Sequence, residues 1–175
     1  MAVPNLRHLQ AFLEVVALGG INAAAVKMHL TQSAVTQAIA AVERHFGAAL
    51  FTRSSTGMHP TAAGRTCAER IERALTQLQE AMDELGRSKL DSRDREQLLR
   101  HVTAAQLTSL IKLVEFRNFT HAARALGVSQ PTIHRAARTL ERPLGAELFE
   151  KTSYGVVPPR EAEKLSQRAH RAFVE

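Results

Sequence analysis

Two short stretches of the sequence carry polar side chains that can hydrogen-bond to the edges of nucleic-acid bases. They lie 98 residues apart and contain Gln32, Ser33, Thr36 and Gln37 in the first and Gln130, Thr132, His134 and Arg135 in the second. Gln can form two hydrogen bonds with adenine and Arg two with guanine, whereas Ser and Thr serve either bases or phosphates. We therefore expect the two stretches to prefer different bases, with phosphate contact or solvation as the alternative for any single residue.

These residues belong to an internal repeat, so one structural explanation must serve both copies. Residues 30–51 read LTQSAVTQAIAAVERHFGAALF, and residues 128–149 read VSQPTIHRAARTLERPLGAELF, aligned without a gap. Any account of function must therefore explain two related modules.

Each copy is expected to form a helix, over residues 31–46 and 129–144. Thr31 and Ser129 can cap the helix starts by accepting a hydrogen bond from a free backbone N–H. Apolar side chains at helical spacing predict a buried stripe in each helix, made by Val35, Ile39, Val42 and Phe46 and by Ile133, Ala137, Leu140 and Leu144. Gly47 and Gly145 then fall where a left-handed C-terminal cap is favourable.

The flanking segments should present these helices to a partner. A short Ala-rich helix precedes each one, with Asn22 or Thr120 as its expected cap, which makes a helix-turn-helix whose second helix enters the major groove. Two short strands around a turn follow each helix and predict a small β-wing that carries one cation, Arg53 or Lys151.

The first copy resembles the winged helix-turn-helix of LysR-type transcriptional regulators. The resemblance rests on the Ala-rich helix AAAVKMHL, the turn TQSAVT, the wing motif LFTR and the element TAAG, in order over about sixty residues. The second copy resembles the same family through FTHAARALGVSQPTI and LFEK. The family resemblance implies DNA binding in the regulation of transcription.

The second copy departs from the family pattern in two places. Residues 159–162 replace the Thr-x-x-Gly element, and Pro143 lies near the end of the expected helix. Proline removes an intrahelical hydrogen bond and restricts the preceding residue, so we expect a shorter or bent second helix. The family usually carries Arg at the position of Gln37 and Ser at that of His134, so its base preferences do not transfer.

The residues expected to contact DNA lie at the starts of the helices or on the wings. They are Asn22, Thr31, Gln32, Ser33, Thr36, Gln37, Arg53, Thr120, Ser129, Gln130, Pro131, Thr132, His134, Arg135 and Lys151.

After the first wing, residues 62–85 read as one long helix with a narrow apolar seam. The seam is formed by Ile71, Leu75, Leu78, Met82 and Leu85. Because a single helix cannot bury such a seam in water, we expect a homodimer through this helix, with packing against its own domain as the alternative. The LysR resemblance implies a dimerising linker helix at the same place.

The sequence thus predicts a mainly α fold with two tandem winged helix-turn-helix domains joined by a long linker (dimerisation) helix. The expected parts are a first domain at residues 1–64, the linker helix and hinge at 65–95, a second domain at 96–160 and the start of a second linker helix at 161–175. Within them, residues 5–18 and 96–116 are expected to be helical. The family places an effector-binding domain after a linker helix, and no segment of this sequence corresponds to one. We therefore expect a fragment of a longer regulator, a naturally short protein being the alternative, and a small-molecule effector only if that domain exists.

Basic residues concentrate on the two repeats. Residues 1–65 hold five Lys or Arg against two Asp or Glu, a charge of +3, and residues 104–175 hold eleven against seven, a charge of +4. Residues 66–103 hold seven against eight, a charge of −1. This partition favours two phosphate-binding modules joined by an ordinary helix.

Other classes of protein fit the sequence poorly. The eight histidines are scattered, and we find no Gly-rich phosphate loop or pair of catalytic carboxylates, so we expect no enzyme, no cofactor and no metal. No apolar run could span a bilayer, and the single Cys67 excludes an intrachain disulfide framework. We expect a cytoplasmic, nucleoid-associated protein with no membrane partner and with Cys67 as an inert side chain on a helix.

These observations predict sequence-specific binding of double-stranded DNA, with helices 31–46 and 129–144 in the major groove and the wings on the phosphate backbone. The rival hypothesis is that the second repeat has become a protein-interaction or dimerisation module and that only the first binds DNA. Pro143 favours the rival, whereas Arg135 and Arg138 favour DNA.

Overall fold

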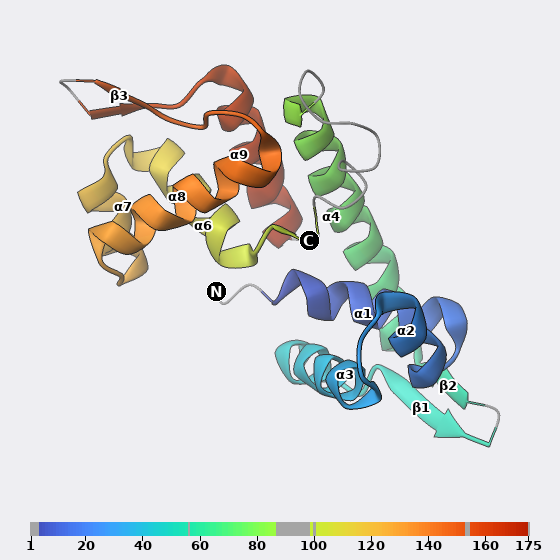
Figure 1. Cartoon of the computed structure of the whole chain (residues 1–175). Helices are drawn as coiled ribbons and strands as arrows, with labels where there is room; N and C mark the ends of the chain where they lie inside the picture. Colours follow the sequence, from blue (N-terminus) through green and yellow to red (C-terminus); the bar gives the residue numbers. More distant parts are fainter. Residues whose placement is uncertain (1–3, 56, 87–98, 100, 153–154, 175) are drawn as a thin grey trace. The chain divides into compact units, whose positions relative to one another are not determined.

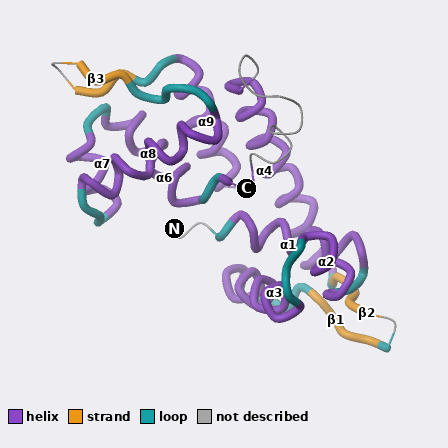
Figure 2. The backbone as a smooth tube through the Cα atoms, viewed as in Figure 1, coloured by secondary structure: helices purple, strands orange, loops and turns teal. Residues whose placement is uncertain are grey.

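The computed structural model describes residues 4–55, 57–86, 99, 101–152 and 155–174. The first repeat folds as helices α1 (Leu6–Leu18), α2 (Ile21–Met28) and α3 (Gln32–Phe46), strands β1 (Phe51–Ser54) and β2 (Gly57–Pro60), and the long helix α4 (Ala62–Gly86). The second folds as α6 (Ala104–Phe116), α7 (Phe119–Leu126), α8 (Gln130–Leu144), β3 (Glu150–Thr152), β4 (Gly155–Val157) and α9 (Arg160–Val174). Figures 1 and 2 show the same succession of helices and one hairpin in each repeat. The predicted mainly α, tandem winged helix-turn-helix fold is confirmed.

The 98-residue offset extends well beyond the repeat seen in the sequence. It carries the bounds of α1, α2 and α3 onto those of α6, α7 and α8 without a single shift. The chain forms two compact units, residues 1–73 and 74–175, so the division falls inside α4.

In both units a three-helix core is closed on one side by a two-stranded hairpin. In the first, the rings of Phe12 on α1 and Phe51 on β1 lie 5.3 Å apart, and Val35 and Val42 of α3 are fully buried beside this core. In the second, Leu107 of α6 and Leu140 of α8 are fully buried. Burying each such side chain stabilises a fold by about 1.5–3 kcal/mol. The core therefore fixes which face of α3 and α8 stays outside.

The helix ends are set mainly by local hydrogen bonds, and two expected caps are wrong. The N-caps of α2 and α7 are Gly20 and Asn118, so Asn22 and Thr120 lie inside the first turns instead. Asn118 Oδ1 accepts hydrogen bonds from the backbone N–H groups of Thr120 and His121 at 2.9 and 3.1 Å. Asn118 can do this because its side chain reaches back over the free N–H groups of the first turn.

The helix expected over residues 96–116 is interrupted. Residues 96–98 and 100 lie outside the described residues, and α6 begins only at Ala104. Thr103 and Gln106 form a reciprocal capping box, in which each side chain accepts a hydrogen bond from the other residue's backbone N–H, at 3.2 and 2.7 Å. This box starts a new helix at a fixed point, which the apolar spacing alone could not locate.

The fully buried stripe expected in α3 and the shortening expected in α8 are both wrong. Phe46 does not complete the buried stripe of α3, since it is 46% exposed and lies edge-on against His45, whereas its counterpart Leu144 is fully buried. Pro143 does not shorten α8, which spans as many residues as α3. Pro143 stands one residue before the end of the helix, so the chain loses a single hydrogen bond there. The caps at Gly47 and Gly145 are confirmed, both with left-handed backbone conformations.

The apolar seam of α4 is largely covered within the single chain. Ile71, Leu75, Leu78 and Met82 are between 0 and 7% exposed, and Leu85 is half-buried. A seam that is already buried does not by itself require a second copy. The homodimer therefore stays a prediction.

Candidate nucleic-acid interface

The exposed end of α3 carries the first group of predicted contact residues. Thr31 caps the helix, with its Oγ1 accepting a hydrogen bond from Ala34 N–H at 3.2 Å and lying 3.0 Å from the hydroxyl of Ser33. The hydroxyl of Thr36 donates to the carbonyl of Gln32 at 2.9 Å. These bonds hold the hydroxyls in place and leave their oxygens able to accept further bonds. The predicted contact residues here, Thr31, Gln32, Ser33, Thr36 and Gln37, are all exposed.

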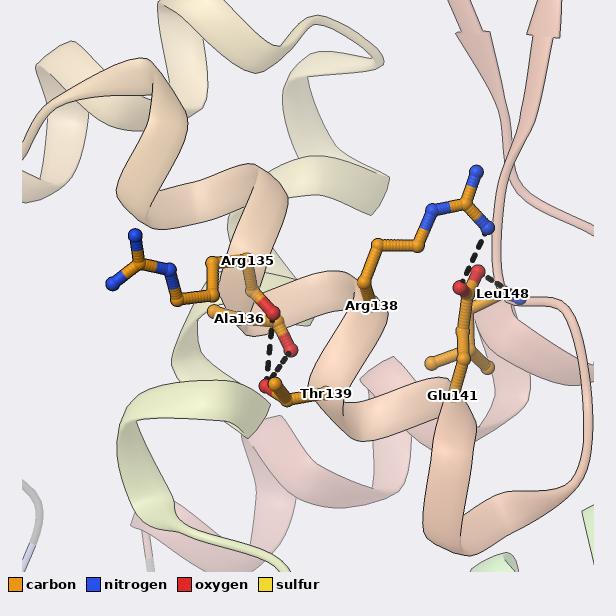
Figure 3. Close-up of polar contacts among 6 residues, drawn as sticks. All are labelled: Arg135, Ala136, Arg138, Thr139, Glu141 and Leu148. Atoms are coloured by element: carbon orange, nitrogen blue, oxygen red, sulfur yellow. Dashed lines mark hydrogen bonds and ion pairs between the residues drawn. The ribbon is translucent and has the colours of Figure 1, made fainter.

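The matching end of α8 is arranged in the same way but is more basic. Ser129 caps it, with its hydroxyl 2.8 Å from that of Thr132. Figure 3 shows the Arg135 side chain extending away from the other labelled residues, whereas Arg138 turns toward Glu141 and pairs with it at 2.8 Å. Within the part of the chain that the structure describes, no hydrogen bond or ion pair engages the guanidinium of Arg135.

Two hollows lie along α8 and bring several predicted residues together. An open one is lined by Gln130, Pro131, His134, Arg135 and Arg138. A smaller one lies between α7, α8 and the second hairpin, and its lining includes Thr120, Gln130 and His134. It also includes Asn118, which sequence reasoning missed, although an Asn just before an Ala-rich helix is a typical cap signal. His134 is held there by its ring contact with Phe119, at 5.2 Å between centroids.

The wings occupy the predicted places in the chain, after α3 and after α8. Arg53 is exposed on β1 opposite Met58, and Lys151 lies on β3 opposite Val156, although the structure does not describe its side chain. The second strand of each hairpin is hydrogen-bonded to the end of the first helix of its unit. Met58 N–H donates to the carbonyl of Gly19 at 2.9 Å, and Val156 N–H donates to the carbonyl of Arg117 at 3.0 Å.

This close approach explains the glycines of the wings. A Cβ on Gly57 would lie 2.5 Å from the Gly19 oxygen, and one on Gly155 would lie 2.9 Å from the Arg117 oxygen. Both glycines also have φ values, +129° and +134°, that other residues rarely adopt.

A carboxylate on α3 and another on α8 each tie their helix to the wing that follows it. Glu43 Oε1 accepts hydrogen bonds from the backbone N–H groups of Leu50 and Phe51 at 2.8 and 3.3 Å. Its counterpart Glu141 accepts one from Leu148 at 3.0 Å, drawn in Figure 3. The Glu43 carboxylate thus turns to the start of the wing and can fix its position.

The Thr-x-x-Gly element has a structural role that the second repeat replaces. Thr61 Oγ1 accepts from Gly64 N–H at 2.9 Å and donates to the carbonyl of Ala49 at 3.0 Å. A Cβ on Gly64 would lie 2.1 Å from the Leu50 oxygen, so glycine is needed there. The second repeat has a fully buried Ala162 instead, which means that α9 and its wing cannot approach as α4 and its wing do.

The two outward faces differ in charge. Where the first repeat has the exposed residues Val26, Gln37 and Ala40, the second has the exposed residues Arg124, Arg135 and Arg138. Because Arg138 is paired with Glu141, the gain is smaller than three free charges. At these three positions the second repeat is nevertheless the more cationic one.

Other kinds of site receive no support from the described residues. Among them there is no group of three or more His, Cys, Asp or Glu that could hold a metal ion. No described helix is long and apolar enough to cross a bilayer. Burial raises the pKa of the half-buried Cys67 thiol to about 11, against a smaller opposing effect of Arg70, so little reactive thiolate forms at neutral pH.

Comparison with known proteins agrees with this geometry. The family model described as "Bacterial regulatory helix-turn-helix protein, lysR family" matches residues 6–65 and again residues 104–163. The HTH-type transcriptional regulator GalR of Pseudomonas putida is 35% identical over 156 residues, which are 89% of this chain and 38% of GalR. TfdT of Cupriavidus pinatubonensis is 43% identical over 61 residues, 35% of this chain and 27% of TfdT.

The chain thus spans well under half of the length of these relatives. Among solved structures, the CbnR chain in a complex of its DNA-binding domain with DNA is 35% identical to this chain. The match covers 41% of this chain and 82% of the CbnR chain, with a TM-score of 0.40. Since that score is low, the assignment rests on the family model. As this model matches both repeats and more than half of the residues, the chain belongs to the LysR family of bacterial regulatory helix-turn-helix proteins.

Proposed function

We propose that the chain binds double-stranded DNA in a sequence-specific manner, as the DNA-binding region of a LysR-type transcriptional regulator. Helices α3 and α8 would lie in the major groove, and the wings would contact the phosphate backbone. The observation that carries the proposal is the pair of capped, outward helix ends, which hold polar side chains in equivalent places of both repeats. The relatives GalR and TfdT, both helix-turn-helix transcriptional regulators, support the same class of function.

The base readers would be the side chains with the most freedom to form paired hydrogen bonds. Gln37 and Arg135 are aligned by the repeat, exposed, and different in chemistry. The amide of Gln37 suits adenine, and the guanidinium of Arg135 suits O6 and N7 of guanine. The residues at the caps and wings would instead fix the register through phosphates.

The rival hypothesis, in which the second repeat only binds protein, is less well supported. A surface that no longer meets DNA has no need of Arg124 and Arg135 in exposed positions. α8 is also as long as α3 despite Pro143, so the second recognition helix is intact.

Selection of duplexes from a random pool at near-physiological salt tests the proposal. The wild type should enrich two distinct elements at a fixed spacing. Gln37→Ala should relax one base position in one element, and Arg135→Ala should do so in the other, each by about 1–3 kcal/mol. Glu150→Ala, which removes an exposed carboxylate from the second wing, serves as the control. A single enriched element would reassign the second repeat, and no enrichment would refute specific recognition.

The remaining expectations are part of this proposal. The homologues are transcriptional regulators, and we expect the chain to have no catalytic activity of its own. We also expect it to act in the cytoplasm with the nucleoid, and to depend on a further domain for any binding of an effector. A homodimer through Ile71, Leu75, Leu78, Met82 and Leu85 is the predicted assembly.

A further inference from the structure

His134 places an ionisable ring on α8 where the first repeat has a hydroxyl. Its counterpart Thr36 is exposed, and the Thr36 hydroxyl donates to the carbonyl of Gln32 at 2.9 Å. The imidazole of His134 is half-buried, and its centroid lies 5.2 Å from that of the Phe119 ring. Phe119 lies in turn 6.3 Å from the buried Phe149, so the hydrophobic core supports one side of the imidazole. This support restricts the rotation of the ring.

The rest of the His134 side chain borders the two hollows along α8. Both hollows count His134 and Gln130 among their lining residues. Within the residues that the structure describes, no hydrogen bond or ion pair engages the ring nitrogens of His134. A ring that is already oriented loses little entropy when it binds. Both nitrogens can therefore bond to a ligand that lies along α8.

The charged side chains that α8 presents to these hollows are cations. They belong to Arg135 and Arg138. Arg138 is paired with Glu141 at 2.8 Å, and Glu141 is not among the described residues that line either hollow. The described part of α8 thus places no carboxylate in the lining that could stabilise a protonated imidazole.

The elements packed against His134 add no carboxylate to the described lining either. α7 and the second hairpin contribute uncharged residues to the smaller hollow, namely Asn118, Phe119, Thr120, Thr152, Gly155 and Val156. The exposed His121, Arg124 and Glu150 of these elements lie outside that lining, and the structure does not describe the side chain of Lys151. A counter-charge for the protonated ring has to come from a ligand.

DNA can supply this counter-charge, because its phosphates are anionic. Imidazole gains or loses its charge between about pH 5 and 8. The protonated ring donates from both nitrogens and forms charge-assisted hydrogen bonds to phosphate, whereas the neutral ring donates from one nitrogen only. Bound DNA should therefore favour the protonated ring, and by thermodynamic reciprocity protonation should raise the affinity for DNA.

We propose that His134 couples DNA binding by the second repeat to the uptake of one proton, so that a lower pH raises the affinity of this repeat for DNA. Because Thr36 has no ionisable group, the first repeat lacks this coupling at the equivalent place. A change of pH would then alter the balance between the two repeats on one operator. The inference rests on the proposed function, since it takes DNA as the ligand, and it adds a regulation of the same site.

Isothermal titration calorimetry of the full chain counts the protons that binding takes up. The ligand is a duplex with the elements enriched by selection, measured at about pH 6.5 in two buffers of different ionisation enthalpy. The wild type should take up about 0.3–1 proton more than His134→Thr, which carries the residue of the first repeat, or His134→Gln, which cannot titrate. His170→Gln should match the wild type, because the exposed His170 lies on α9, outside the lining of both hollows.

The heat of binding and the proton count separate two kinds of failure. Equal proton uptake by the wild type and both His134 variants would overturn the inference, while the heat of binding would still support the proposed function. No heat of binding at any pH would refute the proposed function and the inference with it.

The pH dependence of affinity locates the coupling in one repeat. On a duplex that carries only the second element, the affinity of the wild type should fall by about tenfold between about pH 5.5 and pH 8, and that of His134→Gln by less than about threefold. On a duplex that carries only the first element, the two proteins should change alike. The same pH dependence for both proteins on the second element would contradict the role of His134.

Discussion

Replacing Glu43 by alanine should loosen the first wing without touching any residue proposed to contact DNA. The carboxylate accepts two backbone hydrogen bonds, from Leu50 at 2.8 Å and from Phe51 at 3.3 Å. Both donors belong to buried residues, so both would lose their partners. Hydrogen bonds to charged groups contribute about 1.5–3 kcal/mol, and the second bond is long, so we expect a loss of about 2–4 kcal/mol.

The second repeat supplies a matched comparison. Within the described residues, Glu141 accepts one backbone hydrogen bond, from Leu148, and its pair with the half-exposed Arg138 is worth about 0.2–1 kcal/mol. Glu141→Ala should therefore cost about 1 kcal/mol less than Glu43→Ala. Glu43→Gln keeps an acceptor oxygen but loses the charge, so this variant should keep about half of the stabilisation that Glu43 provides.

Hydrogen exchange of individual amides measures these losses where they occur. In Glu43→Ala, the protection of the Leu50 and Phe51 amides should fall by about 30- to 1,000-fold, since 1.4 kcal/mol corresponds to a factor of ten. The Leu148 amide should be unaffected. In Glu141→Ala, the Leu148 amide should lose protection and the Leu50 and Phe51 amides should keep theirs. Protection of Leu50 within threefold of the wild type, or equal losses in both wings, would refute the view that this carboxylate holds the wing.

Three other changes have outcomes that the structure fixes. Gly64→Ala forces a Cβ to within 2.1 Å of the Leu50 oxygen and should destabilise the first unit by about 1–3 kcal/mol in urea unfolding, whereas a neutral result would show that the wing yields easily. Raising the Cys67 pKa from 9.0 to about 11 lowers its thiolate fraction about 100-fold, so alkylation at pH 8 should be about 100-fold slower than for a free cysteine, and a rate near the free value would refute burial. Because the thiol pKa is higher in the folded than in the unfolded protein, the free energy of unfolding should fall between pH 9 and 11. Arg53→Ala should reduce the slope of log affinity against log salt by about 0.9 at every DNA sequence, and an unchanged slope would remove the wing from the interface.

The sequence was informative wherever a local signal fixed a local structure. Thr31, Ser129, Gly47 and Gly145 end their helices as expected, because capping depends only on residues within one turn. The cap of α2 was predicted wrongly, because Gly20, which has no side chain to form a cap hydrogen bond, occupies the cap position and Asn22 lies inside the helix.

Tertiary contacts could not be predicted in this way. Apolar spacing shows that α4 has a face to bury but not what covers it, and it cannot tell the exposed Phe46 from the buried Leu144 at the same place of the repeat. Glu43 shows the same limit, since nothing in the sequence indicated that its carboxylate would accept a hydrogen bond from Leu50, seven residues further on and just before β1. Only the packing of helix against hairpin determines these outcomes.

The wing is fastened at two points, by Glu43 at its base and by Gly19 along its second strand. We expect a hairpin held in this way to keep a fixed distance from α3. In the proposed complex with DNA, the protein would set this distance, so the duplex would have to supply the matching groove width or be deformed to it. Base pairs that neither the hairpin nor α3 contacts would then influence affinity through their stiffness, and the wing would contribute to selectivity without reading a base.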